Sequence, residues 1–275
     1  MAINDISLTT GMRNNLLSLQ NTNTLINRTQ DRLATGKKVN TALDNPTNFF
    51  AAQGHTSRAA DLSVRKDSMA EAVQLVKAAD NGIKGITALI ESAKGVAGAA
   101  LATASTTDRA NYTTTFNTLM TQITQLASDS GYRGTNLLTA TGTSVGSLTV
   151  EFGQTTGAST LGINGFNATS TGLGITSNSL TTTDAISTAS SQLESALDKL
   201  RSESSKLSAN LSVVTTRQDF TNSMINTLTV GADNLTLADT NEEGANMLML
   251  QTRQNLGITS LSMASQAAQA VLRLF

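Results

Sequence analysis

The sequence predicts a mainly α-helical protein, a long antiparallel coiled-coil helix bundle formed by both ends of the chain, with a small central β-hairpin region. Apolar residues recur every seven positions along several long stretches, which is the repeat of packed helices. One proline in 275 residues leaves helices almost uninterrupted. Aromatic residues are only 3% of the chain, so the bulky anchors of a compact core are few.

The first expected helix carries a heptad stripe near the N-terminus. Its apolar residues fall seven positions apart: Met12, Leu19, Ile26 and Leu33. Leu16 is expected at the second position of this seam, and Gly36 is expected to end the helix. The other faces are rich in Asn and Thr, which are mediocre helix formers, so this segment should be marginal without packing partners.

The second expected helix runs from about residue 46 to about residue 104. Asp44 or Asn45 would cap it, with Pro46 at its first position. Two apolar rows follow the heptad: Leu62, Met69, Val76, Ile83, Ile90 and Ala97, then Ala72, Ala79, Ile86, Ala93 and Ala100. A shorter third helix carries Phe116, Leu119, Ile123 and Leu126 and ends before the turn at residues 129–131.

The middle of the chain, residues 139–183, is dominated by Gly, Ser and Thr. Residues 148–152 alternate as a strand does, and residues 161–163 are the expected partner after a turn near Gly157. We therefore expect a small β-hairpin lobe, with a flexible linker as the alternative.

Helical periodicity returns at about Thr183. One heptad row is Ile186, Leu193, Leu200, Leu207 and Val214, with Leu197 and Leu211 at the second position and Ile225 and Leu228 continuing the apolar face. A break is expected at residues 231–233. Asp239 would cap a last helix, with Glu242 completing a capping box. This helix should carry one apolar stripe: Met247, Leu250, Leu261, Ala264, Ala268, Val271 and Phe275.

The composition argues against most kinds of chemistry. The net charge of -1 provides no electrostatic footprint for nucleic acid, and no apolar run is long enough to cross a membrane. There is no cysteine, and His55 is the only histidine, so we expect no catalytic site, no metal and no cofactor. Residues 1–8 lack the pattern of a cleavable signal peptide.

Both ends of the chain resemble bacterial flagellin. At the N-terminal end the resemblance lies in residues 14–19 (NNLLSL), 32–40 (RLATGKKVN) and 42–46 (ALDNP). At the C-terminal end it lies in residues 238–242 (ADTNE), 249–251 (MLQ) and 265–272 (SQAAQAVL). The chain looks like a short form, because residues 139–183 leave room only for a hairpin where many flagellins insert large outer domains.

The resemblance implies a structural subunit that self-polymerises into the extracellular flagellar filament for swimming motility. It implies a terminal coiled-coil domain (1–40 and 235–275), a helical outer-tube bundle (41–138 and 184–234) and the hairpin lobe (139–183). The terminal segments would be disordered before assembly. The expected polymerisation interface consists of Met12, Leu16, Leu19, Ile26, Leu33, Met247, Leu250, Leu261, Ala264, Ala268, Val271 and Phe275.

The implied partners are other copies of the chain, the flagellar type III export apparatus, an export chaperone, the filament cap and hook-associated junction proteins. Two alternatives remain at this point. A hook–filament junction protein shares terminal motifs with flagellin, and a surface adhesin or binding module would use the polar 139–183 region.

Overall fold

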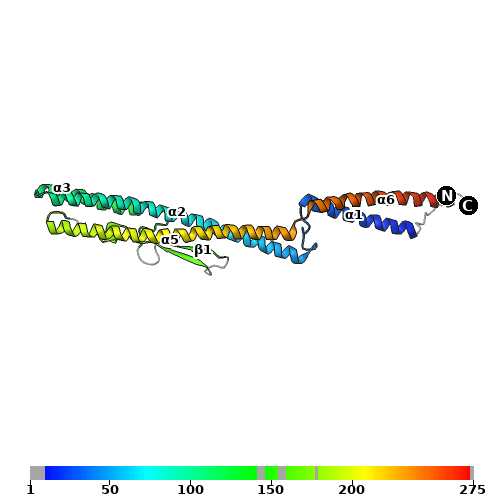
Figure 1. The fold of residues 1–275 in the computed structure, drawn as a ribbon, viewed down its shortest axis with the longest axis horizontal. Coiled ribbons are helices and arrows are strands. Elements are labelled where there is room, and N and C mark those ends of the chain that lie inside the picture. Colours follow the sequence, from blue (N-terminus) through cyan, green and yellow to red (C-terminus); the bar gives the residue numbers. More distant parts are fainter. Residues whose placement is uncertain (1–9, 141–145, 154–158, 177–178, 273–275) are drawn as a thin grey trace. The chain divides into compact units, whose positions relative to one another are not determined.

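The computed structural model describes residues 10–140, 146–153, 159–176 and 179–272. Six helices and two strands follow one another in this part of the chain (Figure 1): α1 (Thr10–Thr35), α2 (Pro46–Ala102), α3 (Thr106–Asp129), β1 (Ser147–Glu151), β2 (Thr160–Asn164), α4 (Ser170–Leu173), α5 (Thr183–Thr236) and α6 (Thr240–Leu272). The mainly helical fold with a central hairpin is confirmed. None of the helices described combines the length and apolar content of a bilayer span.

The chain divides into two compact units. One contains residues 1–57 and 227–275, and the other contains residues 58–226. In the first unit α1 packs against α6, so segments from opposite ends of the sequence form a helical hairpin. The domain boundaries expected from the flagellin resemblance concern the assembled filament and stay a prediction.

The second unit has one continuous core between α2, α3 and α5. Both heptad rows expected for α2 are buried, and all of their residues except Leu62 belong to this core. The α5 row from Ile186 to Val214 is buried in the same core. Alanine at alternate seam positions lets the helices approach closely, while Ile and Leu fill the space between them. Lys94 Nζ of α2 donates a hydrogen bond to Glu194 Oε1 of α5 at 2.7 Å, and this hydrogen bond lowers the pKa of Glu194.

The hairpin prediction is confirmed and the flexible-linker alternative is wrong for the residues described. β1 and β2 pair antiparallel, with Leu148 opposite Ile163 and Val150 opposite Leu161. The side chains of Val150 and Ile163 are buried in the core that α2 and α5 share. The alternation of the strand therefore places one face of the hairpin on the helices. The turn expected near Gly157 lies outside the described residues.

The expected helix ends are confirmed at two places. Gly36 follows α1 with a φ of 68°, a conformation that glycine adopts without steric cost. The Asn45 side chain accepts a hydrogen bond from the Asn48 amide at 3.1 Å, so Asn45 rather than Asp44 caps α2.

The break expected at residues 231–233 is wrong, because α5 continues to Thr236. A Cβ added at Gly231 would lie 3.8 Å from His55 Cδ2, which is ordinary contact distance, and Leu228 and Ala232 beside it are buried. Tertiary packing thus holds the helix through a residue of low helix propensity.

Candidate functional site

The hairpin of α1 and α6 joins the two segments on which the flagellin resemblance rests. On α1, Met12 and Ile26 are buried and Leu19 and Leu33 are half-buried, as the heptad stripe predicts. The second seam position is polar, because Thr22 and Thr29 are buried there. Thr22 Oγ1 is satisfied within the helix, donating to Ser18 O at 2.9 Å.

Leu16 does not lie in this seam. Its side chain is 40% exposed, and the heptad position assigned to it is taken instead by Asn15, which is half-buried. Asn15 Nδ2 donates to Ser260 Oγ of α6 at 3.1 Å. The expectation that Leu16 lines the seam within the subunit is therefore wrong, although its exposure leaves it available to another molecule.

The stripe expected on α6 faces α1. Leu250 is 5% exposed, and Met247, Leu261, Ala264 and Ala268 are half-buried. The side chain of Val271 and all of Phe275 lie outside the described residues. The stripe is thus the inner face of a two-helix hairpin within one chain.

Two residues outside the predicted apolar stripe fill the gap between Leu250 and Leu261. Gln254 and Gly257 are half-buried and continue the heptad spacing. A Cβ added at Gly257 would lie 2.7 Å from Leu19 Cδ2, so the absence of a side chain there lets Leu19 approach the α6 backbone. Gln254 is polar and Gly257 has no side chain, so apolar periodicity does not predict either position.

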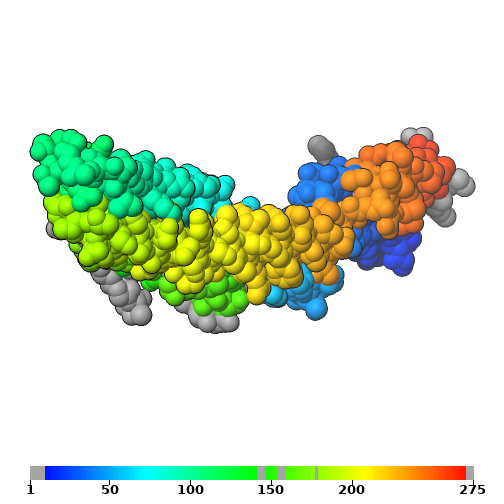
Figure 2. All heavy atoms as spheres, turned by 60° about the vertical axis from the view of Figure 1, so that its left-hand side comes forward, coloured from blue at the N-terminus to red at the C-terminus, as the bar shows by residue number. Residues whose placement is uncertain are grey.

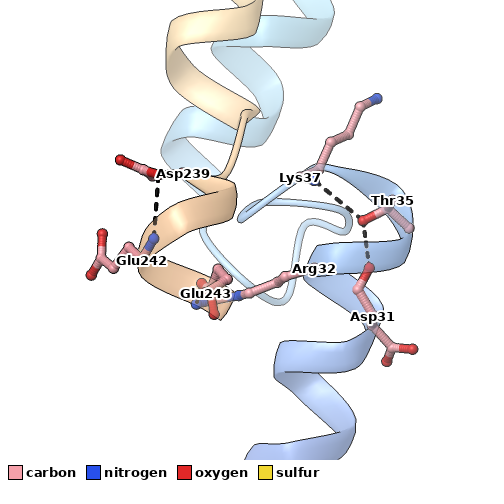
Figure 3. Close-up of polar contacts among 7 residues, drawn as sticks. All are labelled: Asp31, Arg32, Thr35, Lys37, Asp239, Glu242 and Glu243. Atoms are coloured by element: carbon pink, nitrogen blue, oxygen red, sulfur yellow. Dashed lines mark hydrogen bonds and ion pairs between the residues drawn. The ribbon is translucent and has the colours of Figure 1, made fainter. Parts of the chain in front are cut away.

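An ion pair ties the base of the hairpin (Figure 3). Arg32 Nη1 of α1 donates to Glu243 Oε1 of α6 at 2.7 Å. The exposed fractions of the two side chains are 27% for Arg32 and 8% for Glu243, so the carboxylate is the more deeply buried partner. The capping pattern predicts a role for Glu242 and none for Glu243, because the two adjacent acids differ only in the direction they face.

The helix cap expected at Asp239 is confirmed. Asp239 Oδ1 accepts a hydrogen bond from the Asn241 amide at 2.8 Å. It also accepts one from the Glu242 amide at 3.3 Å (Figure 3). The connection into α6 is also tied to the segment after α1, where Ala238 N donates to Gly36 O at 2.9 Å. These backbone contacts set where α6 starts relative to the end of α1.

Asp44 organises the segment between α1 and α2. Its Oδ2 accepts hydrogen bonds from the Asn40 amide at 3.1 Å, the Thr41 amide at 2.9 Å and Thr41 Oγ1 at 3.1 Å. The backbone hydrogen bonds from Thr41 and Asn40, the side-chain bond from Thr41 and the nearby charge of Arg32 hold the pKa of Asp44 below its ordinary value.

The hairpin base also forms a polar cleft of about 270 Å³, lined by Arg32, Lys38, Asp44, Asp239, Glu242 and Glu243 among others. Its charges are of both signs. Over residues 10–140, 146–153, 159–176 and 179–272, no three His, Asp or Glu side chains gather as a metal site would require. His55, the only histidine of the sequence, is half-buried on α2.

A second apolar row on α6 points away from α1. Met249, Leu256 and Met263 fall seven residues apart and are 52%, 66% and 60% exposed. We call these three residues the outward row. Leu248 and Ile258 beside it are also exposed. The open surface of α6 is visible in orange in Figure 2. α6 is therefore apolar on two faces, of which one packs against α1 and the other is exposed.

Comparison with known proteins identifies the family. The model for the bacterial flagellin N-terminal helical region matches residues 6–143. Flagellin FljM of Caulobacter vibrioides is 30% identical over 278 residues, covering 100% of both chains. The chain belongs to the flagellin family. Flagellin FljO of the same bacterium is 30% identical over 281 residues, again across 100% of both chains.

A crystal structure of Bacillus cereus flagellin has 18% sequence identity to the chain and a TM-score of 0.49, over 56% of this chain and 88% of that one. Family membership rests on the sequence matches above. It confirms the prediction of a non-enzymatic structural subunit of the extracellular flagellar filament, which forms by self-polymerisation.

Proposed function

We propose that the polymerisation interface of this flagellin has two layers on the α1–α6 hairpin. The first consists of the predicted residues that face the seam, such as Ile26 and Leu250, and it holds the two helices together. The second is the outward row of α6, which contacts neighbouring subunits. Leu16, exposed on α1, belongs to this second layer. We assign Val271 and Phe275 to the first layer from the sequence alone, because they continue the heptad spacing of the seam residues Ala264 and Ala268.

The observation that carries the proposal is the double periodicity of α6. One heptad row is covered by α1, and the outward row repeats at the same spacing on another face. Met249 and Met263 are separated by fourteen residues, about 21 Å along a helix. Exposed apolar rows of this length mark contacts with another protein chain. In a filament, that chain is another copy of the same subunit, joined by an open, heterologous contact.

The test compares Leu256→Ser with Gln251→Ser, a substitution at an exposed polar position of the same helix. Burying a leucine contributes about 1.5–3 kcal/mol, so we expect Leu256→Ser to raise the critical concentration about 10- to 100-fold. Gln251→Ser should leave it nearly unchanged. Sedimentation of filaments after seeding gives both values, and circular dichroism checks the helix content. Equal critical concentrations for Leu256→Ser and the unmodified protein would rule out the outward row.

The seam layer predicts a different failure. Leu250→Ser should loosen the hairpin itself, lowering assembly together with the protection of α1 and α6 amides from hydrogen exchange. Deleting residues 1–40 or 240–275 should leave a soluble, helical subunit that does not polymerise. Filaments formed by either truncated protein would contradict the role of the hairpin.

The flagellar type III export apparatus, an export chaperone, the filament cap and the hook-associated junction proteins complete the proposed set of partners. Their support is family membership, and the exposed outward row gives a chaperone a surface to cover before assembly. Inactivating the export apparatus in the source bacterium should leave the subunit inside the cell, uncleaved. Its appearance in the medium at normal levels would contradict this part of the proposal.

A further inference from the structure

A cleft with two positive charges lies on the helical unit of residues 58–226. Its volume is about 230 Å³, and it is lined by side chains of α2 and α5 and by residues at the ends of β1 and β2. Its charged and aromatic side chains are Arg58 of α2, Phe152 next to β1, and Arg217 and Phe220 of α5. None of these residues belongs to the terminal segments that are expected to order only on assembly, so the cleft does not depend on the α1–α6 hairpin.

One aromatic ring of the cleft is covered and the other is open. Phe152 is 8% exposed, and the guanidinium carbon of Arg217 lies 5.2 Å from the centre of its ring, in a cation–π contact. Phe220, three residues further along α5, is 56% exposed. Binding energy at protein interfaces concentrates on arginine and aromatic side chains. The open ring between two guanidinium groups therefore favours a contact with another protein chain.

The positive charge of the cleft is not neutralised by its own lining, which contains two arginines and no acidic side chain. Arg58 is exposed, and in the part of the chain that the structure describes no carboxylate pairs with it. The four remaining arginines of this unit do have polar partners: Arg65 pairs with Glu151, Arg133 with Glu71 and Arg201 with Asp198, and Arg109 donates to backbone carbonyls. Because guanidinium N–H groups match the two oxygens of a carboxylate, the cleft is suited to accept a carboxylate from outside the subunit.

We propose that this cleft receives a carboxylate side chain from a second copy of the subunit in the filament. The inference rests on self-polymerisation, which family membership shows, and not on the outward row of α6. The same unit supplies complementary charges, because Asp67, Glu91 and Asp184 are exposed and form no ion pair among the residues described. None of the three lines the cleft, so the contact joins two different surfaces and continues from copy to copy as an open filament requires.

Reversing the charge of the cleft should weaken assembly. Arg58→Glu places a carboxylate where another carboxylate has to bind, and like charges in contact oppose association. We expect the critical concentration, measured by sedimentation after seeding, to rise about tenfold or more. Phe220→Ser removes the open ring and should raise it about threefold or more. The matched control is Lys77→Glu, which makes the same charge change at an exposed position of α2 outside the cleft and should change it less than about twofold.

A charge swap tests whether the occupant is a second copy. Arg58→Glu is combined in turn with Asp67→Arg, Glu91→Arg and Asp184→Arg, and circular dichroism checks the helix content of each protein. One of the three double variants should restore assembly, because each copy then carries the reversed pair of charges. If all three assemble as poorly as Arg58→Glu alone, the proposal is wrong.

Chemical labelling tests the same contact without a variant. An arginine-specific dicarbonyl reagent is applied to free subunits and to filaments, and peptide mass spectrometry compares the extent of labelling. Arg58 should react readily in the free subunit and slowly in the filament. Equal reaction in the two states would mean that the cleft stays open to solvent, which overturns the proposal in favour of a ligand from outside the filament.

The outcomes separate this contact from the outward row. If Arg58→Glu assembles as well as Lys77→Glu while Leu256→Ser does not assemble, the cleft fails and the outward row stands. If Leu256→Ser assembles normally while Arg58→Glu is impaired and one charge swap restores it, the outward row fails and the cleft stands.

Discussion

Removing Arg32 should destabilise the hairpin more than removing the charge of Glu243. In Arg32→Met, a carboxylate whose side chain is only 8% exposed loses its partner. Breaking a fully buried ion pair costs about 3–5 kcal/mol, and because Arg32 is itself 27% exposed we expect about 2–3 kcal/mol here. In Glu243→Gln the amide oxygen still accepts a hydrogen bond and Arg32 can turn toward water, so the expected cost is about 1 kcal/mol.

Hydrogen exchange in assembled filaments measures the difference in hairpin stability between the two variants. Peptides of α1 and α6 in Arg32→Met should exchange about thirtyfold faster or more, which corresponds to about 2 kcal/mol of local opening free energy. Peptides of α3 serve as an internal reference. Arg201→Met breaks an ion pair with Asp198 whose side chains are 73% and 75% exposed, and it should change exchange very little.

The order of the two effects is the sensitive part of this prediction. Because the argument depends on which partner is more deeply buried, a larger effect for Glu243→Gln than for Arg32→Met would refute it. Unchanged exchange in both variants would show that the pair does not hold the hairpin together.

Three further predictions concern local packing and pH. A Cβ at Gly82 would lie 2.2 Å from Ser130 Oγ, so Gly82→Ala should lower the free energy of unfolding by about 1–2 kcal/mol in urea titrations, whereas Gly98→Ala, with open space, should raise it by about 0.5–1 kcal/mol. Ile90→Ala, at a fully buried seam position, should lower the free energy of unfolding by about 2–5 kcal/mol in the same assay. Leu101→Ala, at an exposed position outside the seam, should lower it by less than about 0.5 kcal/mol. Because the pKa of Asp44 is lowered by folding, Asp44→Asn should melt below the unmodified protein at neutral pH, and the difference should disappear as pH falls through the lowered pKa; a difference that persists in strong acid would contradict the assignment.

The heptad rows were predictable from the sequence because the seven-residue spacing of apolar residues is enough to predict packed helices. Ile90 and Leu200 belong to rows in which every seventh residue is apolar. In a chain with a single proline, this period predicts long helices that pack against each other. The hairpin was predictable for the same reason, since alternation identifies a strand. The terminal motifs then identified the family.

Other features depend on packing that spacing does not encode. Gly231 reads as a helix break in isolation, and only its position beside His55 shows why α5 continues. Glu243 and Glu242 are the same residue type in adjacent positions, so their different burial could not be inferred before α1 was placed. The outward row was not predicted, because only one apolar stripe was expected on α6 and Met249, Leu256 and Met263 are not part of it.

The central claim is that the outward row of α6 joins one subunit to the next. A cryo-electron microscopy reconstruction of filaments grown from the purified protein tests it most directly. The account predicts that Met249, Leu256 and Met263 are covered by neighbouring subunits, with Arg32 and Glu243 still paired inside each hairpin. Filaments in which the three residues face solvent or an open channel would contradict it.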